Sequence, residues 1–576
     1  MRRVVFAVSV LALLPLFAGA DSGDPYLDVM EQAVRAYSDE HVVRYLAEAE
    51  RNGVQEHGFP RLAANLGVLI ANGRMADRRG VFARMMTVAC RDAAKGKMPP
   101  KSGGNDFSVK ELAIALHALE VTKVFPQEMT DAWRADLRRV ETTRCYSVVP
   151  VVGNVQRGFN WCVFGSASEQ ARLAYGLGGD PAFVERYVAD QIRWFDANGM
   201  YRDPHEPAVY DLVTRLQFAA ILRYGYDGAS KAKLEEAMDR SAEPTLRMLS
   251  ACGEIPYGGR SNQFLHNHTF YSALCEWYAA HYAAKGEAAK ARRFKAAARR
   301  SVEALRDWLA VRPVRHVKNM YPCASGLGCE GYAYFDKYMV TMGSWAMMAR
   351  EFAVDLPAEA SPDVPGVFAT SPDFHWVFMS AGGYSAQFDY AANPHYDCDG
   401  LGRIHRRGAP PQICLSAPCA QKPSYRIAGT NLTALAIAPV AEGKLSLVKS
   451  ESSADRAVTE WTVGGQTWRC SLSAAGMEMS LFGAGEVALS LPVFEFDGET
   501  SATIEKDAKR VSTVYRGWRC GYETDGELVA TGLSAENRNG RYLRFEARGN
   551  GALKVKVAIE RVDVRQQGET LKEKQK

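Results

Sequence analysis

The stretch FKAAARRSVEALRDW, residues 294–308, spaces its apolar side chains three or four positions apart. Phe294, Ala298 and Val302 therefore fall on one face of a helix. The opposite face is basic with acidic residues interspersed, which is typical of a solvated surface rather than a nucleic-acid-binding stripe. The segment predicts a helix that buries one side only.

Helical spacing of this kind extends back to residue 24. Asp24 followed by Pro25 predicts a helix start, because Asp caps the first turn and Pro fits its first position. Short loops such as residues 178–181 separate the helices, and no repeat of fixed period is visible, which disfavours a solenoid. Helices paired as hairpins are compatible with a closed ring. We expect an (α/α) toroid over residues 21–355.

The hydrophobic period changes to two after residue 366. Residues 553–559 alternate in this way, and Asn550-Gly551 just before them predicts a hairpin turn. Gly464-Gly465 predicts a second hairpin. Short strands without helical patterning predict an antiparallel β-sandwich over residues 366–565, after a Pro-containing linker at 353–366. The expected fold class is therefore α+β and multidomain.

The chain begins like a secretory signal peptide, which we place at residues 1–20. Two arginines precede an apolar run over residues 4–17 that is too short to span a membrane, and Ala18-Gly19-Ala20 follows as a cleavage site. We expect cleavage before Asp21 and an exported protein, periplasmic or secreted. A polar tail occupies residues 566–576.

Composition narrows the classes of partner. The formal net charge is +4, from 70 basic and 66 acidic residues, which gives no electrostatic reason to expect nucleic acid or a membrane surface. An exported chain can form disulfides, and buried free thiols are the equal alternative. No Cys spacing matches a zinc site, and we expect no metal and no cofactor. The close cysteine pairs are Cys323 with Cys329, Cys414 with Cys419, and Cys470 with Cys520.

Four stretches of the helical region combine aromatic rings with polar groups: residues 156–161, 201–215, 254–271 and 330–338. Sugars need this mixture, because rings stack on C–H faces while planar polar groups bind hydroxyls. Singly, each residue could be a packing anchor or a helix cap, but together they predict a carbohydrate cleft. The candidate substrate-binding residues are Asn160, Trp161, Tyr201, Arg202, Tyr210, Arg215, Arg260, Asn262, Tyr332 and Tyr338.

The stretch 254–271 has the groups that β-elimination from a uronic acid requires. A cation or amide neutralises the C6 carboxylate, a base then removes the C5 proton, and an acid protonates the departing oxygen. If a helix starts near Asn262, that residue shares a face with His266. The alternative is that the histidines are core residues. The roles assigned are Arg260 and Asn262 for the carboxylate, His266 or His268 as base, and Tyr271 or Tyr257 as acid.

A glycoside hydrolase would instead need two carboxyl groups across a cleft. Glu330 and Asp211 are the leading candidates for that pair. One loop of the sandwich, residues 393–407, is also unusual. It could hold a metal through His395, Asp397, Asp399 and His405, but its spacing matches no standard metal loop. We favour a loop that reaches over the toroid and helps to close the cleft.

The motifs resemble a known group of enzymes. They are Asn160-Trp161 opening a helix, Asn198-Gly199-Met200-Tyr201-Arg202-Asp203, Ile255-Pro256-Tyr257-Gly258-Gly259-Arg260-Ser261, and Glu330-Gly331-Tyr332. The set is similar to α/α-toroid enzymes among the polysaccharide lyases and uronide-cleaving glycoside hydrolases. The layout resembles the heparinase and chondroitin-lyase type, although no heparinase-like His-rich sandwich motif matches. The resemblance implies a carbohydrate-active enzyme.

Three functions follow from these observations. The leading one is an exported polysaccharide lyase that cleaves a uronic-acid-containing glycan by β-elimination, which the pair His266 and His268 favours. The second is a β-glucuronidase-like glycoside hydrolase, which the Glu330 loop also fits. The third is a non-catalytic carbohydrate-binding protein. The partner expected in each case is a uronate-containing polysaccharide or oligosaccharide.

Overall fold

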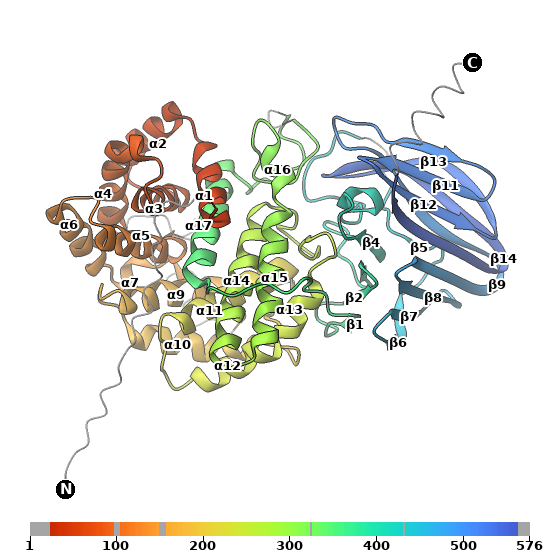
Figure 1. Cartoon of the computed structure of the whole chain (residues 1–576), viewed down its shortest axis with the longest axis horizontal. Coiled ribbons are helices and arrows are strands. Elements are labelled where there is room, and N and C mark those ends of the chain that lie inside the picture. The colour runs from red at the N-terminus through yellow and green to blue at the C-terminus, as the bar shows by residue number, and fades with distance from the viewer. Residues whose placement is uncertain (1–22, 97–103, 149–156, 323–324, 430–432, 563–576) are drawn as a thin grey trace, which may run out of the picture.

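The computed structural model describes residues 23–96, 104–148, 157–322, 325–429 and 433–562. Helices occupy one end of the long axis and strands the other (Figure 1). This confirms the predicted helical first part and antiparallel second part. The predicted signal peptide and polar tail lie outside the described residues. Within the described ranges, every helix is too short or too polar to cross a lipid bilayer.

The helices alternate along the chain between fully buried ones and amphipathic ones. Every residue of α3 is buried, whereas α15 buries only the face that carries Ala291, Phe294 and Ala298. A helix that is apolar all round must lie inside, and a one-sided helix can cover it. The helices are α1 Pro25–Arg35, α2 Asp39–Asn52, α3 Gly58–Ala71, α4 Arg79–Lys95, α5 Val109–Thr122, α6 Gln127–Arg138, α7 Thr142–Cys145, α9 Asn160–Ala174, α10 Pro181–Gln191, α11 Ala208–Arg223, α12 Lys231–Arg240, α13 Ala242–Met248, α14 His266–Ala284, α15 Ala288–Glu303, α16 Arg306–Ala310 and α17 Phe335–Phe352.

The buried helices contact one another in a closed cycle. Helix α3 packs against α5, α5 against α9, α9 against α11, α11 against α14, and α14 against α17. Helix α17 then packs back against α3, so the last buried helix touches the first. The amphipathic helices α4, α10 and α15 each pack on one member of this ring, against α3, α9 and α14. The helical part is therefore a ring of helices covered by an outer layer.

Two predicted helix starts are confirmed and one is wrong. Asp24 caps α1 by accepting the Tyr26 backbone N–H at 2.9 Å, and α9 begins at Asn160 as expected. Helix α14 begins at His266 rather than near Asn262. The residues before it form turns, with Ser261 at φ 64° and Gln263 at φ 65°, and a left-handed backbone cannot continue a right-handed helix. Asn262 and His266 consequently share no helix face.

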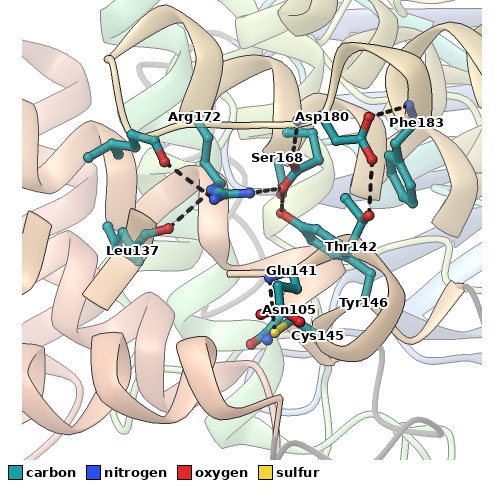
Figure 2. Close-up of polar contacts among 12 residues, drawn as sticks. Asn105, Leu137, Glu141, Thr142, Cys145, Tyr146, Ser168, Arg172, Asp180 and Phe183 are labelled. Carbon is teal, nitrogen blue, oxygen red and sulfur yellow. Dashed lines mark hydrogen bonds and ion pairs between the residues drawn. The ribbon is translucent and has the colours of Figure 1, made fainter. Parts of the chain in front are cut away.

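Buried polar contacts fix the outer connection between α6, α9 and α10 (Figure 2). Arg172 of α9 points toward the end of α6, where its Nε donates to the Leu137 carbonyl at 3.2 Å. Asp180 caps α10 by accepting the Phe183 backbone N–H at 3.0 Å, and it also accepts from the Thr142 hydroxyl at 3.2 Å. Helix ends that would otherwise leave backbone groups unsatisfied are closed in this way.

The second part consists of two antiparallel sheets that share one hydrophobic core. One sheet has the order β1-β2-β3-β4, and the larger has the order β10-β11-β12-β14-β9-β8-β7-β6, with β13 pairing with β14 and β5 with β9. Helix α17 ends at Phe352 and β1 begins at Gly366, which frames the predicted linker. The strands are β1 Gly366–Ala369, β2 Trp376–Ala381, β3 Tyr384–Asp389, β4 Gly400–Arg406, β5 Ala438–Pro439, β6 Ser446–Ser452, β7 Arg456–Val463, β8 Gln466–Ser473, β9 Gly476–Phe496, β10 Thr503–Lys506, β11 Arg510–Tyr515, β12 Trp518–Thr524, β13 Glu527–Asn537 and β14 Gly540–Arg561.

Of the two predicted hairpin turns, one is confirmed. Gly464 and Gly465 join β7 to β8, with φ of 55° and 76°, as a type I′ turn requires. The turn predicted at Asn550-Gly551 is wrong, because β14 runs through it without a break. The register against β9 shifts between Asn550 and Ala552, and Gly551 has φ 73°. A Gly in this conformation makes a β-bulge, which the sequence pattern alone does not separate from a turn.

The suggested disulfides are absent wherever the structure describes both cysteines. Cys414, Cys419, Cys470 and Cys520 are buried free thiols, so two of the three suggested disulfides are wrong. Strands β8 and β12, which carry Cys470 and Cys520, do not face each other because β9 and β14 lie between them. The third pairing involves Cys323, which lies outside the described residues.

Candidate active site

A cavity of about 260 Å³ opens within the helix ring. Five ring helices, α3, α9, α11, α14 and α17, contribute to its wall, together with short segments that flank them. Among the described residues that line it there is no Asp or Glu. The lining residues are His57, Arg61, Phe107, Asn160, Trp161, Phe164, Val209, Tyr210, Val213, Ser261, His266, Asn267, Phe270, Tyr332, Lys337, Tyr338, Thr341 and Trp345.

Four other hollows in the described part of the chain are larger, two of them only slightly, at about 340 and 280 Å³. One of about 780 Å³ lies between α1, α15 and α16, and its Glu276 and Asp24 are paired with Lys295 and Arg350. Another, of about 380 Å³, lies where α16 meets the sheets. Neither of these two contains any of the substrate-binding residues predicted from the sequence, whereas the hollow of about 280 Å³ contains one of them, Arg202. The cavity in the ring contains Asn160, Trp161, Tyr210, Tyr332 and Tyr338 from that set, and His266 as well.

His266 is the first residue of α14 and is 8% exposed. Its ring stacks on Tyr338, with ring centroids 5.4 Å apart and planes 19° from parallel. Its Nδ1 is buried and finds no hydrogen-bond partner among the described residues. Burial, with the positive charges of Arg61 and His316, lowers the pKa of His266 to about 3. The imidazole is therefore neutral at physiological pH and can accept a proton.

Tyr210 and Tyr332 meet at the mouth of the cavity through Ser261, and Tyr338 lies beside Tyr332. The Ser261 hydroxyl lies 2.6 Å from the Tyr332 hydroxyl and 3.2 Å from that of Tyr210. Tyr332 is 38% exposed, and its ring lies 6.2 Å from that of Tyr338. Burial raises the pKa of Tyr332 and Tyr338 well above the ordinary value, so both hydroxyls keep their protons. Ser261 holds this arrangement with φ 64°, a strained backbone of the kind that clusters at functional sites.

Amide side chains and one cationic side chain lie next to these tyrosines. Asn160 donates from Nδ2 to Asp203 at 2.8 Å, and Asp203 forms an ion pair with Arg260. The Arg260 guanidinium lies over the Tyr210 ring, 4.2 Å from its centroid. Arg260 thus supports the wall from behind Tyr210 rather than lining the cavity. Asn267 donates to the Ser261 carbonyl at 3.0 Å, and within the described chain its buried Oδ1 has no partner.

The sheets hold the segment that carries Ser261. Gly259 donates its backbone N–H to Asp397 Oδ2 at 2.8 Å, and Gln387 Nε2 donates to the Tyr257 carbonyl at 2.7 Å. Arg403 donates to the Ile255 carbonyl at 2.9 Å. The loop that contains Asp397 therefore does contact the helical part, although its end forms strand β4. The rim of the cavity depends on both parts of the chain.

The two histidines of that loop that could bind a metal make other contacts instead. His405 lies 3.0 Å from both the Ser250 hydroxyl and the Leu415 carbonyl, and His395 lies 2.9 Å from the Lys422 carbonyl. Across the described ranges, no cluster of three or more His, Cys, Asp or Glu side chains could hold a metal ion.

Several predicted catalytic residues lie away from the cavity and make contacts inside the protein, although His268 Nε2 is buried without a partner among the described residues. Asp211 pairs with Arg215 at 2.6 Å, with both side chains fully buried. Glu330 pairs with Arg538 at 2.7 Å, and those side chains are 3% and 2% exposed. The remaining contacts are His268 Nδ1 to the Ser301 carbonyl at 3.0 Å, the Tyr271 hydroxyl to the Thr245 carbonyl at 2.7 Å, and the Tyr257 hydroxyl to the Gln387 carbonyl at 3.1 Å.

The other predicted binding residues also fall outside the lining. The Tyr201 hydroxyl accepts from the Phe159 N–H at 2.8 Å, and Arg202 pairs with Asp373 at 3.2 Å. Asn262 donates to the Gly259 carbonyl at 3.0 Å. These residues shape the loops around the cavity. Only six of the residues predicted from the sequence line the cavity itself.

Apart from Tyr338, sequence reasoning did not select the lining residues that come from the first and last helices of the ring, α3 and α17. Arg61 is the only charged residue in α3, whose fourteen residues are otherwise apolar or neutral and all buried. An isolated Arg in such a helix is a signal, because charges are buried only where they have a partner or a function. Lys337 and Thr341 of α17 carry no comparable signal.

Comparisons with known proteins give likeness of fold only. No protein-family model and no curated protein sequence matches the chain. Among solved structures, a heparan sulfate lyase from Pedobacter heparinus matches at 10% identity and a TM-score of 0.33, covering 92% of this chain and 94% of its own. A glycosyl hydrolase of family 88 from Bacteroides vulgatus matches at 10% and 0.35, covering 57% of this chain and 97% of its own. A chondroitinase AC lyase matches at 9% and 0.34, covering 95% and 84%.

Proposed function

We propose that the protein is an exported polysaccharide lyase that cleaves a uronic-acid-containing glycan by β-elimination. We interpret the closed cycle of helices as an (α/α) toroid and the two sheets as a β-sandwich. The observation that carries the proposal is the cavity in the ring. It holds a neutral imidazole, three tyrosines, amides and cations, and the described residues that line it include no carboxyl group.

The reaction uses these groups in sequence. The uronate carboxylate is neutralised by the cationic and amide groups of the wall, which makes the C5 proton acidic enough to leave. His266 accepts that proton at a ring nitrogen, and the electron pair forms the C4–C5 double bond. The bond from C4 to the glycosidic oxygen breaks, and the Tyr332 hydroxyl gives its proton to that oxygen. Solvent then restores both protonation states.

His266 has a low basicity because burial disfavours the imidazolium. A bound carboxylate brings a negative charge beside the ring, and this charge stabilises the protonated form. The substrate itself therefore raises the pKa of the base on which its cleavage depends. Tyr332 replaces Tyr271 and Tyr257 in the acid role, because its hydroxyl is at the mouth and theirs are bonded inside the protein.

The hydrolase alternative has less support from this geometry. A glycosidase of either stereochemistry requires two carboxyl groups, roughly 5–9.5 Å apart across the scissile bond. Glu330 and Asp211, the carboxylates considered for this role, are each paired with a buried arginine. Freeing either one would leave that arginine without its counterion.

The test is a panel of uronate-containing glycans incubated with the purified protein. Elimination forms a C4–C5 double bond that absorbs in the near ultraviolet, together with one new reducing end for each bond cleaved. Equal amounts of the two products support the proposal. Reducing ends without absorbance would establish a hydrolase, and binding without either product would establish a carbohydrate-binding protein.

A further inference from the structure

One wall of the cavity is made by a buried arginine. Arg61 is 2% exposed, and its Nη1 donates to the Thr341 hydroxyl at 2.9 Å. Its Nη2 lies 3.3 Å from Glu111 Oε1, and its guanidinium lies 4.9 Å from the centroid of the Trp345 ring. Its Nε has no hydrogen-bond partner within the described chain. Arg61 is thus rigidly held and keeps one donor unused.

A second buried cation shares the same carboxylate. Lys110 of α5 is fully buried, and its Nζ lies 3.4 Å from Glu111 Oε1 and 3.0 Å from Gln217 Oε1. Glu111 is therefore the single carboxylate in contact with both cations. Burial lowers the pKa of Arg61 and of Lys110, and the nearby charge of Arg61 lowers that of Lys110 further. The contacts themselves place two cations against one carboxylate. An anion placed in the cavity would relieve this imbalance.

We propose that Arg61 binds the carboxylate of an acidic sugar in the cavity, with Glu111 and Lys110 as the positioning residues that hold it there. The inference rests on the proposed function in that a glycan occupies the cavity. It goes further by giving the carboxylate-binding role, first assigned to Arg260 and Asn262, to a residue of α3. Arg61 and His266 line the same cavity, so a carboxylate bound to Arg61 would share that space with the base.

The test measures binding without turnover. The probes are the methyl glycosides of glucuronic, galacturonic and iduronic acid, each paired with its neutral counterpart, methyl glucoside, galactoside or idoside. Dissociation constants are obtained from ligand-observed NMR titrations. The protein is expected to prefer at least one uronide by about tenfold or more, because a hydrogen bond to a charged group is worth about that ratio. No preference for any of the three would overturn the inference.

Four variants assign the preference to named residues. Arg61→Lys keeps the positive charge but loses the planar guanidinium, which can donate two parallel hydrogen bonds to a carboxylate. The ratio of uronide affinity to neutral-sugar affinity should therefore fall about tenfold. Arg35→Lys, the same change at an exposed position on α1, is the matched control and should leave this ratio unchanged. Lys110→Met should weaken uronide binding less than Arg61→Lys, and Lys110→Arg should restore it. Circular dichroism establishes that each variant is folded.

The outcomes separate this inference from the proposed function. Unchanged uronide preference in folded Arg61→Lys would overturn the inference, whether or not elimination is observed. Loss of preference in that variant would support the inference even if the glycan panel showed no elimination. In that case the lyase mechanism would fall and the anion-binding role of Arg61 would stand.

Discussion

His266 and His268 lie two residues apart on α14 and have different surroundings. His266 lines the cavity and stacks on Tyr338, whereas His268 is directed toward α15 and bonds to the Ser301 carbonyl. Residues two positions apart on a helix lie on nearly opposite sides of it. Helix α14 has the cavity on one side and its covering helix α15 on the other. The position of a histidine in the ring therefore decides whether it can act as a base.

The sharpest test of this comparison is the pair His266→Gln and His268→Gln. Loss of a proton-transfer residue typically costs about 10²–10⁴-fold in rate, so kcat/KM of His266→Gln should fall within that range. His268→Gln should stay within about tenfold of the wild type, because it removes a contact between helices. Initial rates of absorbance increase measure both, with folding checked by circular dichroism. A reversed order would break the assignment.

A second test compares residues of the cavity with residues that form buried ion pairs. Glu330→Gln leaves Arg538 buried without its counterion, which should lower the free energy of unfolding by about 3–5 kcal/mol. The folded fraction should keep its kcat, because Glu330 takes no part in the lyase mechanism. Denaturant unfolding gives the first quantity, and activity per folded molecule gives the second. A stable but inactive Glu330→Gln protein would favour the hydrolase instead.

The tyrosines allow a similar test with a smaller effect. Tyr332→Phe removes the proposed acid at the mouth and should lower kcat about 10²-fold. Tyr271→Phe removes a hydroxyl that donates to the Thr245 carbonyl, so it should change stability more than kcat. Steady-state kinetics on the same glycan compare the two variants. Equal losses of kcat would mean that Tyr332 has no special role.

The smallest predicted effect concerns pH. An unfolded histidine gains a proton below its ordinary pKa of 6.5, whereas folded His266 gains one only near pH 3. The unfolded state therefore binds more protons in this window, and stability falls as pH falls through it, by up to about 1.4 kcal/mol per pH unit for one histidine. His266→Gln should lose less stability than the wild type between pH 7.5 and 5.5. Denaturant unfolding at the two pH values measures the difference, and equal losses would contradict the buried neutral imidazole.

Local patterns predicted the features that depend on local chemistry. The cap at Asp24, the start of α9 and the turn at Gly464-Gly465 each follow from backbone geometry over a few residues. The bulge at Gly551 was predicted as a turn, because a left-handed Gly serves both and only the partner strand distinguishes them. Local chemistry thus gives the element but not its pairing.

The site was predicted in part for the same reason. Its residues reach the cavity from distant segments, and aromatic and polar crowding selected Asn160, Tyr210 and Tyr332, which line it. The same crowding selected Asp211 and Arg215, whose spacing of four on one helix already indicates an ion pair. The closure of the ring determines which face of each helix points into the cavity. Ring closure depends on contacts between segments far apart in the sequence, so a local pattern does not predict it.

The closure of the ring by α3 and α17 has a consequence for how the protein is made. Arg61 and Thr341, whose side chains are in contact, are 280 positions apart in sequence. Their meeting requires the closure of a very long loop, which is slow and entropically costly. A growing chain can build most of the wall early, yet the Arg61 guanidinium meets its Thr341 partner only after α17 has been synthesised. A chain that ends before α17 therefore lacks this contact and one wall of the cavity.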